Sequence, residues 1–139
     1  MRSMIIVKAT AETETASAPA QTLNAALHTF HRELGEAGVL RDLTALHPSS
    51  EGWRIQYEGD GHDVVTGPFG EPTGIVAGYT VIEVPTREAA IEWSRRFPNP
   101  AGNGVGEIEV RALFELAPPE PIDPAEIRRR MALGEELPE

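Results

Sequence analysis

The stretch from residue 67 to residue 114 constrains the fold more than any other part of this chain. It begins with a loop rich in Gly and Pro, Gly67–Gly74, and continues as a strand, an amphipathic helix and a closing strand. Small, aromatic and β-branched residues predict the first strand over Ile75–Val84. Apolar side chains that alternate with charged ones predict the last strand over Gly106–Leu116. This order of elements indicates one βαβ unit.

The helix of this unit has a predicted start, end and buried side. Thr86 is placed to cap its N-terminus, and Glu88 lies in the first turn, where the helix dipole favours an anion. Pro98 and Pro100 end the helix. The residues predicted to face the core are Ala89, Ala90, Trp93 and Phe97.

The first half of the chain repeats the order strand, helix, strand. Ser3–Ala9 is typical of a buried strand, and Val39–Leu46 of a second, less regular one. A helix is predicted from about Pro19 to Ala37, with Gly38 as its left-handed C-terminal cap. The apolar side of this helix consists of Leu23, Leu27, Phe30 and Leu34.

Two further segments lie between these elements. Thr10–Thr22 has no apolar pattern, so we expect a flexible connection there. Alternating side chains predict a hairpin from Trp53–Glu58 and His62–Thr66, joined at Gly59–Gly61. The whole pattern predicts an α+β fold, a ferredoxin-like split βαβ sandwich with an inserted β-hairpin. Both helices would cover one face of the sheet, and a second copy of the chain would cover the other in a two-fold homodimer.

We expect residues 1–117 to form this one domain and residues 118–139 to form an extended tail with a short helix. Asp123 and Glu126 have the spacing of a capping box, with Pro124 in the first helical position. Ile127 and Met131 lie four apart, so the tail helix would either remain at the surface or clasp the dimer partner.

The charge balance narrows the range of partners. The 139 residues include 12 Lys and Arg against 22 Asp and Glu, a net charge of −10, and no Cys. A strongly acidic chain is a poor ligand for nucleic acid or for anionic lipid, so we expect neither. Met4–Val7 is too short an apolar run for a signal sequence or a membrane span, and a cytoplasmic location is expected.

Six short segments, spread over nearly the whole chain, form a recognisable series of motifs. They are Met4–Ala9, Leu46–Ser50 (Leu-His-Pro-Ser-Ser), Gly67-Pro68-Phe69 with Glu71, Glu92-Trp93, Pro98–Pro100 and Glu107–Arg111. In their order and spacing the chain resembles the YCII-related family, in particular its subgroup with the DGPF motif. The resemblance implies a ferredoxin-like fold paired into a dimeric α/β barrel, with a cavity between sheet and loops. Some relatives resemble lyases or dehydrochlorinases that act on small aromatic substrates.

The chain departs from this family pattern at two places. The Asp that precedes Gly-Pro-Phe in the family is Thr66 here, and the usual Gly-Glu-Gly before Leu-His-Pro is Leu43-Thr44-Ala45. Each change replaces a carboxylate by a neutral hydroxyl, which is not a general base near pH 7. If the family uses a His–carboxylate pair, this chain has kept His47 and lost the expected partners.

His47, and the pair of His28 and His31, can each be interpreted in two ways. His47 either moves a proton, because its pKa lies near neutrality, or hydrogen-bonds the loop and fixes the turn before Pro48. His28 and His31 lie three apart on the first helix, which is close enough to share a metal ion. A third ligand is missing, so we expect a solvated helix face and neither a metal nor a cofactor.

Other charged and aromatic residues suggest a ligand site. Lys8, Tyr79 and Arg111 lie on strands expected to be central, where they either hold an anionic or phenolic ligand or pair across strands. In the second case Lys8 and Arg111 would pair with Glu83 and Glu109. The loop with Phe69 and Glu71 would cap the cavity or wrap the partner subunit.

Three functions remain open from the sequence. The first is a homodimeric, cofactor-free domain that binds an anionic or aromatic metabolite through Lys8, His47 and Arg111. The second is a lyase or hydrolase in which His47 is the acid or base and Glu71 the carboxylate. The third is a dimeric interaction module without a ligand.

Overall fold

The computed structural model describes residues 1–15, 21–71, 74–115, 123–132 and 134, without the side chains of residues 21–24 and 130. The elements follow the predicted order, with two short helices added. In chain order they are β1 (Arg2–Lys8), α1 (Ala11–Thr15), α2 (Gln21–Glu36), β2 (Leu40–Ala45), the 3₁₀ helix η1 (Ser49–Glu51), β3 (Trp53–Glu58), β4 (Gly61–Thr66), β5 (Val76–Glu83), α3 (Arg87–Arg95), β6 (Ile108–Ala112) and α4 (Pro124–Ala132).

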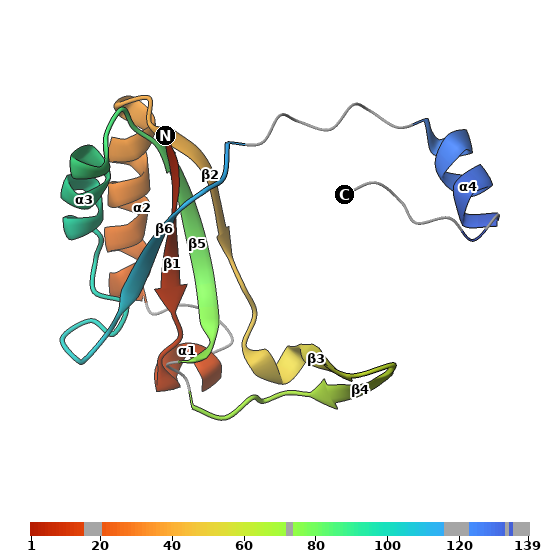
Figure 1. The fold of residues 1–139 in the computed structure, drawn as a ribbon. Coiled ribbons are helices and arrows are strands. Elements are labelled where there is room, and N and C mark those ends of the chain that lie inside the picture. The colour runs from red at the N-terminus through yellow and green to blue at the C-terminus, as the bar shows by residue number, and fades with distance from the viewer. Residues whose placement is uncertain (16–20, 72–73, 116–122, 133, 135–139) are drawn as a thin grey trace.

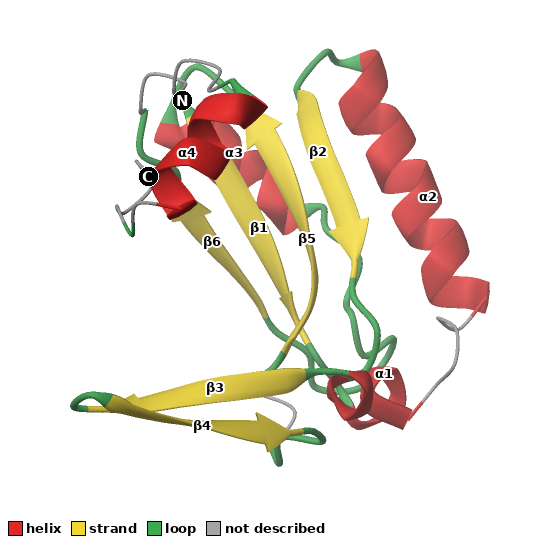
Figure 2. Ribbon diagram, turned by 90° about the vertical axis from the view of Figure 1, so that its right-hand side faces the viewer, coloured by secondary structure: helices red, strands yellow, loops and turns green. Residues whose placement is uncertain are grey.

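The core of the molecule is a four-stranded antiparallel sheet with the strand order β2-β5-β1-β6. Helices α2 and α3 lie together on one face of it, and the other face is not covered by them (Figures 1 and 2). The mixed α+β class is therefore confirmed, and the strand order is that of two interleaved βαβ units. The single chain does not close into a barrel.

The register of the sheet decides which residues form the core. Ile5 on β1 lies opposite Thr80 on β5 and Val110 on β6, and all three side chains point to the helix-covered face. Phe30 of α2 packs edge-on against Phe97, with ring centroids 5.2 Å apart, and against Trp93 at 6.5 Å. Each large apolar side chain buried in this way stabilises the fold by about 1.5–3 kcal/mol. The buried cluster consists of Ile5, Phe30, Leu34, Ile82, Val84 and Ala90.

The predicted C-terminal cap of α2 and the predicted N-terminal cap of α3 are confirmed, whereas α3 already ends at Arg95, before Phe97 and Pro98. Gly38 has a φ of 75°, and the N–H of Val39 donates to the carbonyl of Leu34 at 3.1 Å, as in a Schellman C-cap. The Thr86 hydroxyl accepts a hydrogen bond from the N–H of Ala89 at 3.1 Å, so it caps α3. Leu23 carries no described side chain, and Pro19 lies outside the described residues.

The prediction of a flexible connection over Thr10–Thr22 is wrong at its start. Residues 11–15 form the helical turn α1, and residues 16–20 lie outside the described residues. Thr10 and Thr13 cap this turn reciprocally, because each hydroxyl accepts from the backbone N–H of the other residue at 2.7 and 3.2 Å. Such local side-chain capping holds a single turn without an apolar face.

The outer strands are shorter than predicted, and the tail helix stands apart. The observed strands β2 and β6 leave out Val39, Leu46 and the residues on both sides of 108–112. Helix α4 has the predicted cap, since Asp123 Oδ1 accepts from the N–H of Ala125 at 2.9 Å. It lies away from the sheet, with Met131 64% exposed (Figure 1). None of the helices within the described ranges is long and apolar enough to cross a membrane.

Candidate functional site

A cavity of about 300 Å³ lies between α2 and the sheet, at the end next to α1. Helix α2 covers it from one side, β2 and β5 form its floor, and the segment after α3 closes it. Its walls are mainly apolar, which is typical of a site for a small organic ligand. The lining residues are Val7, Thr13, Leu27, His28, His31, Leu43, Thr44, Ala45, Ala77, Gly78, Tyr79, Thr80, Phe97 and Pro100.

His31 and Thr80 provide the polar side of this cavity. The Nε2 atom of His31 lies 2.8 Å from the Thr80 hydroxyl, which is 1% exposed. The imidazole is half-buried and meets the Phe97 ring edge-on, with centroids 6.4 Å apart. Burial, and secondly the neighbouring His28, lower the pKa of His31 below its ordinary value. His31 is therefore neutral at pH 7 and shares one proton with the hydroxyl.

The prediction of a solvated face for both histidines is wrong for His31. Residue 31 follows Leu27 by four and precedes Leu34 by three, so it continues the buried stripe of α2. That spacing is the sequence signal that could have placed it in the core. His28 is exposed and borders the same cavity.

Lys8 and Arg111 come to the opposite, uncovered face of the sheet. There the Glu109 carboxylate lies 3.7 Å from Lys8 Nζ and 3.3 Å from the Arg111 guanidinium. The predicted pairing across strands is thus confirmed for Lys8 with Glu109, whereas Arg111 pairs with Glu109 within the same strand, β6. Arg111 lies on the edge strand β6, so its expected central position is wrong. Tyr79 is among the residues that line the cavity, although the strand register turns its side chain to the uncovered face.

Glu83 takes a different partner from the predicted one. Its carboxylate accepts a hydrogen bond from Arg41 Nε at 2.7 Å, across the pair of strands β2 and β5. The prediction that Glu83 pairs with Lys8 or Arg111 is wrong, because Glu83 lies at the far end of β5, opposite Arg2. The hydrogen bond from Arg41 lowers the pKa of Glu83.

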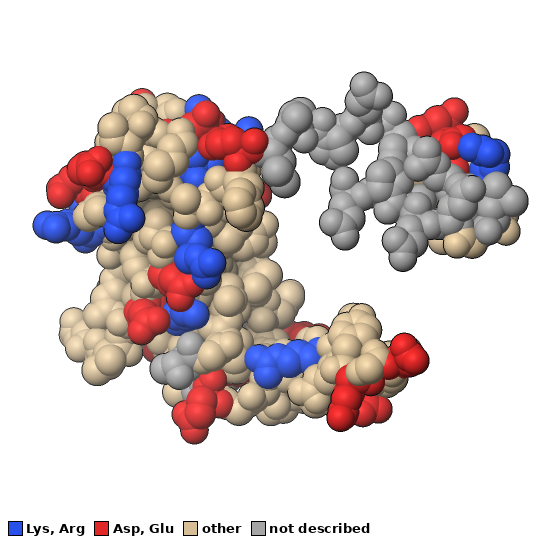
Figure 3. All heavy atoms as spheres, viewed as in Figure 1, with Lys and Arg blue, Asp and Glu red and all other residues tan. Residues whose placement is uncertain are grey.

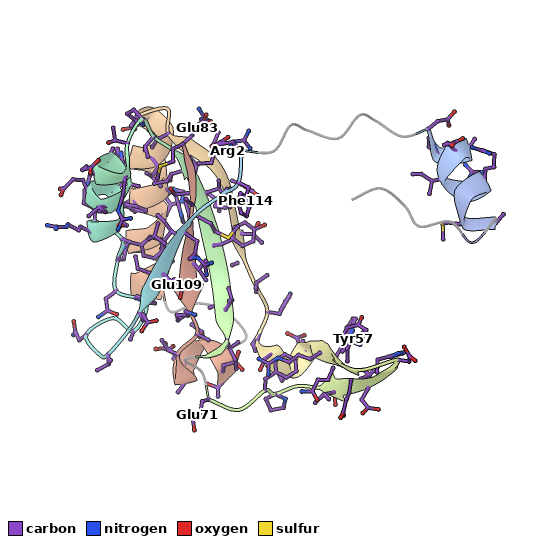
Figure 4. All side chains as sticks on the ribbon, in the orientation of Figure 1. Arg2, Tyr57, Glu71, Glu83, Glu109 and Phe114 are labelled. Atoms are coloured by element: carbon purple, nitrogen blue, oxygen red, sulfur yellow. The ribbon has the colours of Figure 1, made fainter. Side chains whose placement is uncertain are left out.

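His47 and Phe69 lie in a second, more open hollow at the base of the hairpin. His47 Nδ1 lies 3.0 Å from Glu51 Oε2, so the histidine has an orienting carboxylate after all. The 3₁₀ turn between them brings residues 47 and 51 together, and the sequence pattern did not reveal it. The imidazole is 83% exposed, and the Arg54 guanidinium stacks 4.1 Å from the centre of the Phe69 ring. Glu71 is exposed and points away from both hollows (Figure 4).

Ser49 joins three segments beside this hollow. Its N–H donates to Glu14 Oε1 at 3.0 Å, and its hydroxyl also bonds the Glu14 carboxylate. The same hydroxyl accepts from the N–H of Phe69 at 3.2 Å. The Leu-His-Pro-Ser loop, the Gly-Pro-Phe loop and α1 are thus tied at one residue that is 6% exposed.

The chain matches the sequence model of a known protein family. The sequence model of a family described as the YCII-related domain matches residues 1–117, the part of the chain from β1 through β6. No curated protein matches the chain.

Proposed function

Since the chain belongs to the YCII-related domain family, we propose that it is a homodimeric small-molecule-binding domain. Its ligand is a small aromatic metabolite with a polar or anionic substituent. Its site is the cavity between α2 and the sheet. The observation that carries the proposal is the His31–Thr80 pair set into an otherwise apolar wall.

The chemistry of the cavity selects this ligand class. Leu27, Leu43 and Phe97 offer an apolar surface, which favours a ring and disfavours a sugar or a polyphosphate. A volume of about 300 Å³ is enough for one substituted ring. Thr80 and the neutral imidazole of His31 would hydrogen-bond a phenol or a carboxylate, and an anion would favour the protonated form of His31.

The homodimer is proposed from the uncovered face of the sheet. By the strand register, Met4 and Ile6 of β1 lie there beside Val81 and Tyr79 of β5. A stripe of apolar residues across a sheet face favours burial against another sheet, and a second copy is the simplest partner. Two such sheets facing each other would form the dimeric α/β barrel that the family resemblance implies.

Binding is tested by titrating the full-length chain with phenol and benzoate while following two-dimensional amide NMR spectra. We expect saturable shifts at residues around the cavity, among them Thr80 and Ala45. In Ala45→Leu, which fills the cavity, affinity should fall at least about tenfold. In Thr80→Val the loss of one hydrogen bond should weaken binding about fivefold.

Ala112→Leu is the matched control, since it makes the same exchange on the edge strand β6, outside the cavity. It should bind both probes like the unchanged chain. Equal affinity of Ala45→Leu and the unchanged chain would show that the probes bind elsewhere.

A second candidate function, a lyase or hydrolase, is favoured by the contact between His47 and Glu51. If Nδ1 donates to the carboxylate, Nε2 is left free to accept a proton from a substrate. Turnover of small aromatic ester or halide probes should then be abolished in His47→Ala and reduced in Glu51→Gln. His62→Ala, at another exposed histidine, is the control. Turnover that survives His47→Ala would exclude this mechanism.

A further inference from the structure

The hairpin of β3 and β4 is separate from the main sheet. Among the described residues its two strands pair only with each other, from Trp53 opposite Thr66 to Glu58 opposite Gly61. The ribbon leaves the body below the sheet and extends outward (Figures 1 and 2). A two-stranded hairpin alone in water is only marginally stable, so its order calls for a surface that covers it.

One side of this ribbon is apolar and exposed. Alternation along β3 places Trp53, Ile55 and Tyr57 on the same side, and Val64 of β4 lies opposite Ile55. Trp53 is 65% exposed, Tyr57 77% and Val64 62%. The other side carries Arg54, Gln56, Glu58, Asp63 and Val65. The ribbon is therefore amphipathic, and the described residues of its own chain leave the apolar side uncovered.

The apolar side of the hairpin and the uncovered face of the sheet border the same recess. In Figure 1 the sheet and the projecting hairpin form the two arms of an L. In Figure 4 the side chain of Tyr57, on the hairpin, and that of Phe114, just after β6, both project into this recess. Phe114 is 91% exposed. An L-shaped surface with apolar residues on both arms is self-complementary under a two-fold rotation.

The two arms differ in the charges that they carry. Glu58, Asp60 and Asp63 lie at or next to the turn of the hairpin. Figure 3 shows acidic side chains gathered at the tip of the hairpin. The sheet arm presents Arg2 and Arg111, and the Arg111 side chain, although it pairs with Glu109, is 72% exposed. Opposite charges at the rim of an interface fix its register and steer the encounter. They favour a second copy of this chain over a hydrophobic partner without charge.

We propose that the hairpin is an arm that packs its Trp53–Tyr57 side against a second copy of the chain, beside the two facing sheets, each subunit clasping the other. This inference rests on the proposed homodimer and adds the residues that hold it together. It also places the His47–Glu51 pair, at the base of the arm, beside the partner subunit.

The test compares two double variants on the same strand. Ile55→Thr with Tyr57→Thr removes the apolar side, and Gln56→Thr with Glu58→Thr alters the other side with the same new residue. Sedimentation equilibrium of the full-length chain gives the dimer dissociation constant. We expect the first variant to raise it at least about a hundredfold, because two arms lose their anchors, and the second to change it less than about threefold.

Trp53 reports directly on the arm. In a Trp93→Phe background it is the remaining tryptophan, and its emission should shift to the blue as dilute monomer is concentrated into dimer. The shift should be absent when Ile55→Thr and Tyr57→Thr are added.

Each other outcome overturns a specific statement. The dimer could form while Trp53 keeps the emission of a water-exposed indole and the dissociation constant does not change in the Ile55 and Tyr57 variant. That result would contradict the arm but not the homodimer. A chain that is monomeric at all concentrations would contradict both the arm and the homodimer. If deleting residues 118–139 exposes Trp53 while the dimer persists, the tail of the chain is the occupant and the inference fails.

Discussion

Gly67 and Ser49 approach so closely that a Cβ atom on Gly67 would lie 1.8 Å from the Ser49 carbonyl oxygen. The Gly-Pro-Phe loop can therefore lie against the Leu-His-Pro-Ser loop only with glycine at this position. The N–H of Gly67 in turn donates to the carbonyl of Gly52 at 3.0 Å, so both loops are fixed by backbone contacts.

Gly67→Ala should destabilise the fold by about 1–3 kcal/mol, because the added methyl group meets backbone that cannot move aside. Urea unfolding followed by circular dichroism measures the change. Gly74→Ala, where a Cβ meets nothing within 4 Å, should stay within about 0.5 kcal/mol. Equal costs for the two variants would contradict the close approach.

Ser49→Ala should cost about 1–3 kcal/mol, because the Glu14 carboxylate and the N–H of Phe69 each lose a partner. Hydrogen exchange of the amides in α1 and in the Gly-Pro-Phe loop should accelerate at the same time. Ser50→Ala, at the exposed neighbouring serine, should leave both unchanged. Unaltered exchange in Ser49→Ala would mean that Ser49 does not join these segments.

His31 should make stability depend on pH. Its pKa is lowered in the folded chain, so the unfolded chain binds more protons near the ordinary value of 6.5. The contribution of neutral His31 to the free energy of unfolding is complete above pH 6.5, the ordinary value. It is lost as the pH falls from that value toward the lowered pKa of the folded chain. Unfolding free energies between about pH 8 and pH 5 should therefore fall less steeply in His31→Gln than in the unchanged chain. His62→Gln, on the exposed hairpin, should keep the original slope.

Phe30→Ala should remove about 3–5 kcal/mol of stability, because Phe97 and Trp93 lose the ring against which they pack. The midpoint of thermal unfolding measures the loss. Thr29→Ala, at the exposed neighbouring position, should shift it little. A Phe30→Ala midpoint close to that control would place the core elsewhere.

The fold was largely predictable because its signals are local and periodic. Thr86, Gly38 and Asp123 each satisfy a helix end through neighbours in the sequence, and all three caps are confirmed. Short helices escaped prediction because α1 and η1 have no apolar stripe and depend on capping and on contacts with distant residues. The Glu14–Ser49 bond spans 35 positions, and no spacing rule reveals such a contact.

The site was less predictable, because residue type alone does not reveal the face of the sheet or helix to which a side chain points. Lys8 and Arg111 turned out to share Glu109 on the uncovered face, away from the cavity. A solvated position was predicted for His31 from the sequence, although its spacing from Leu27 and Leu34 follows the buried stripe. The partner of His47 was sought in the missing family carboxylates, whereas the 3₁₀ turn supplies Glu51.

The pairing of β1 also bears on how a ribosome can make this protein. β1 leaves the exit tunnel well before its two neighbours, β5 and β6, with Ile5 opposite Thr80 and Val110. The central strand of the sheet therefore remains without a partner until more than half of the chain has been translated. Chains rich in such distant pairings fold slowly, and a strand edge that stays unpaired during synthesis is exposed to aggregation for that time.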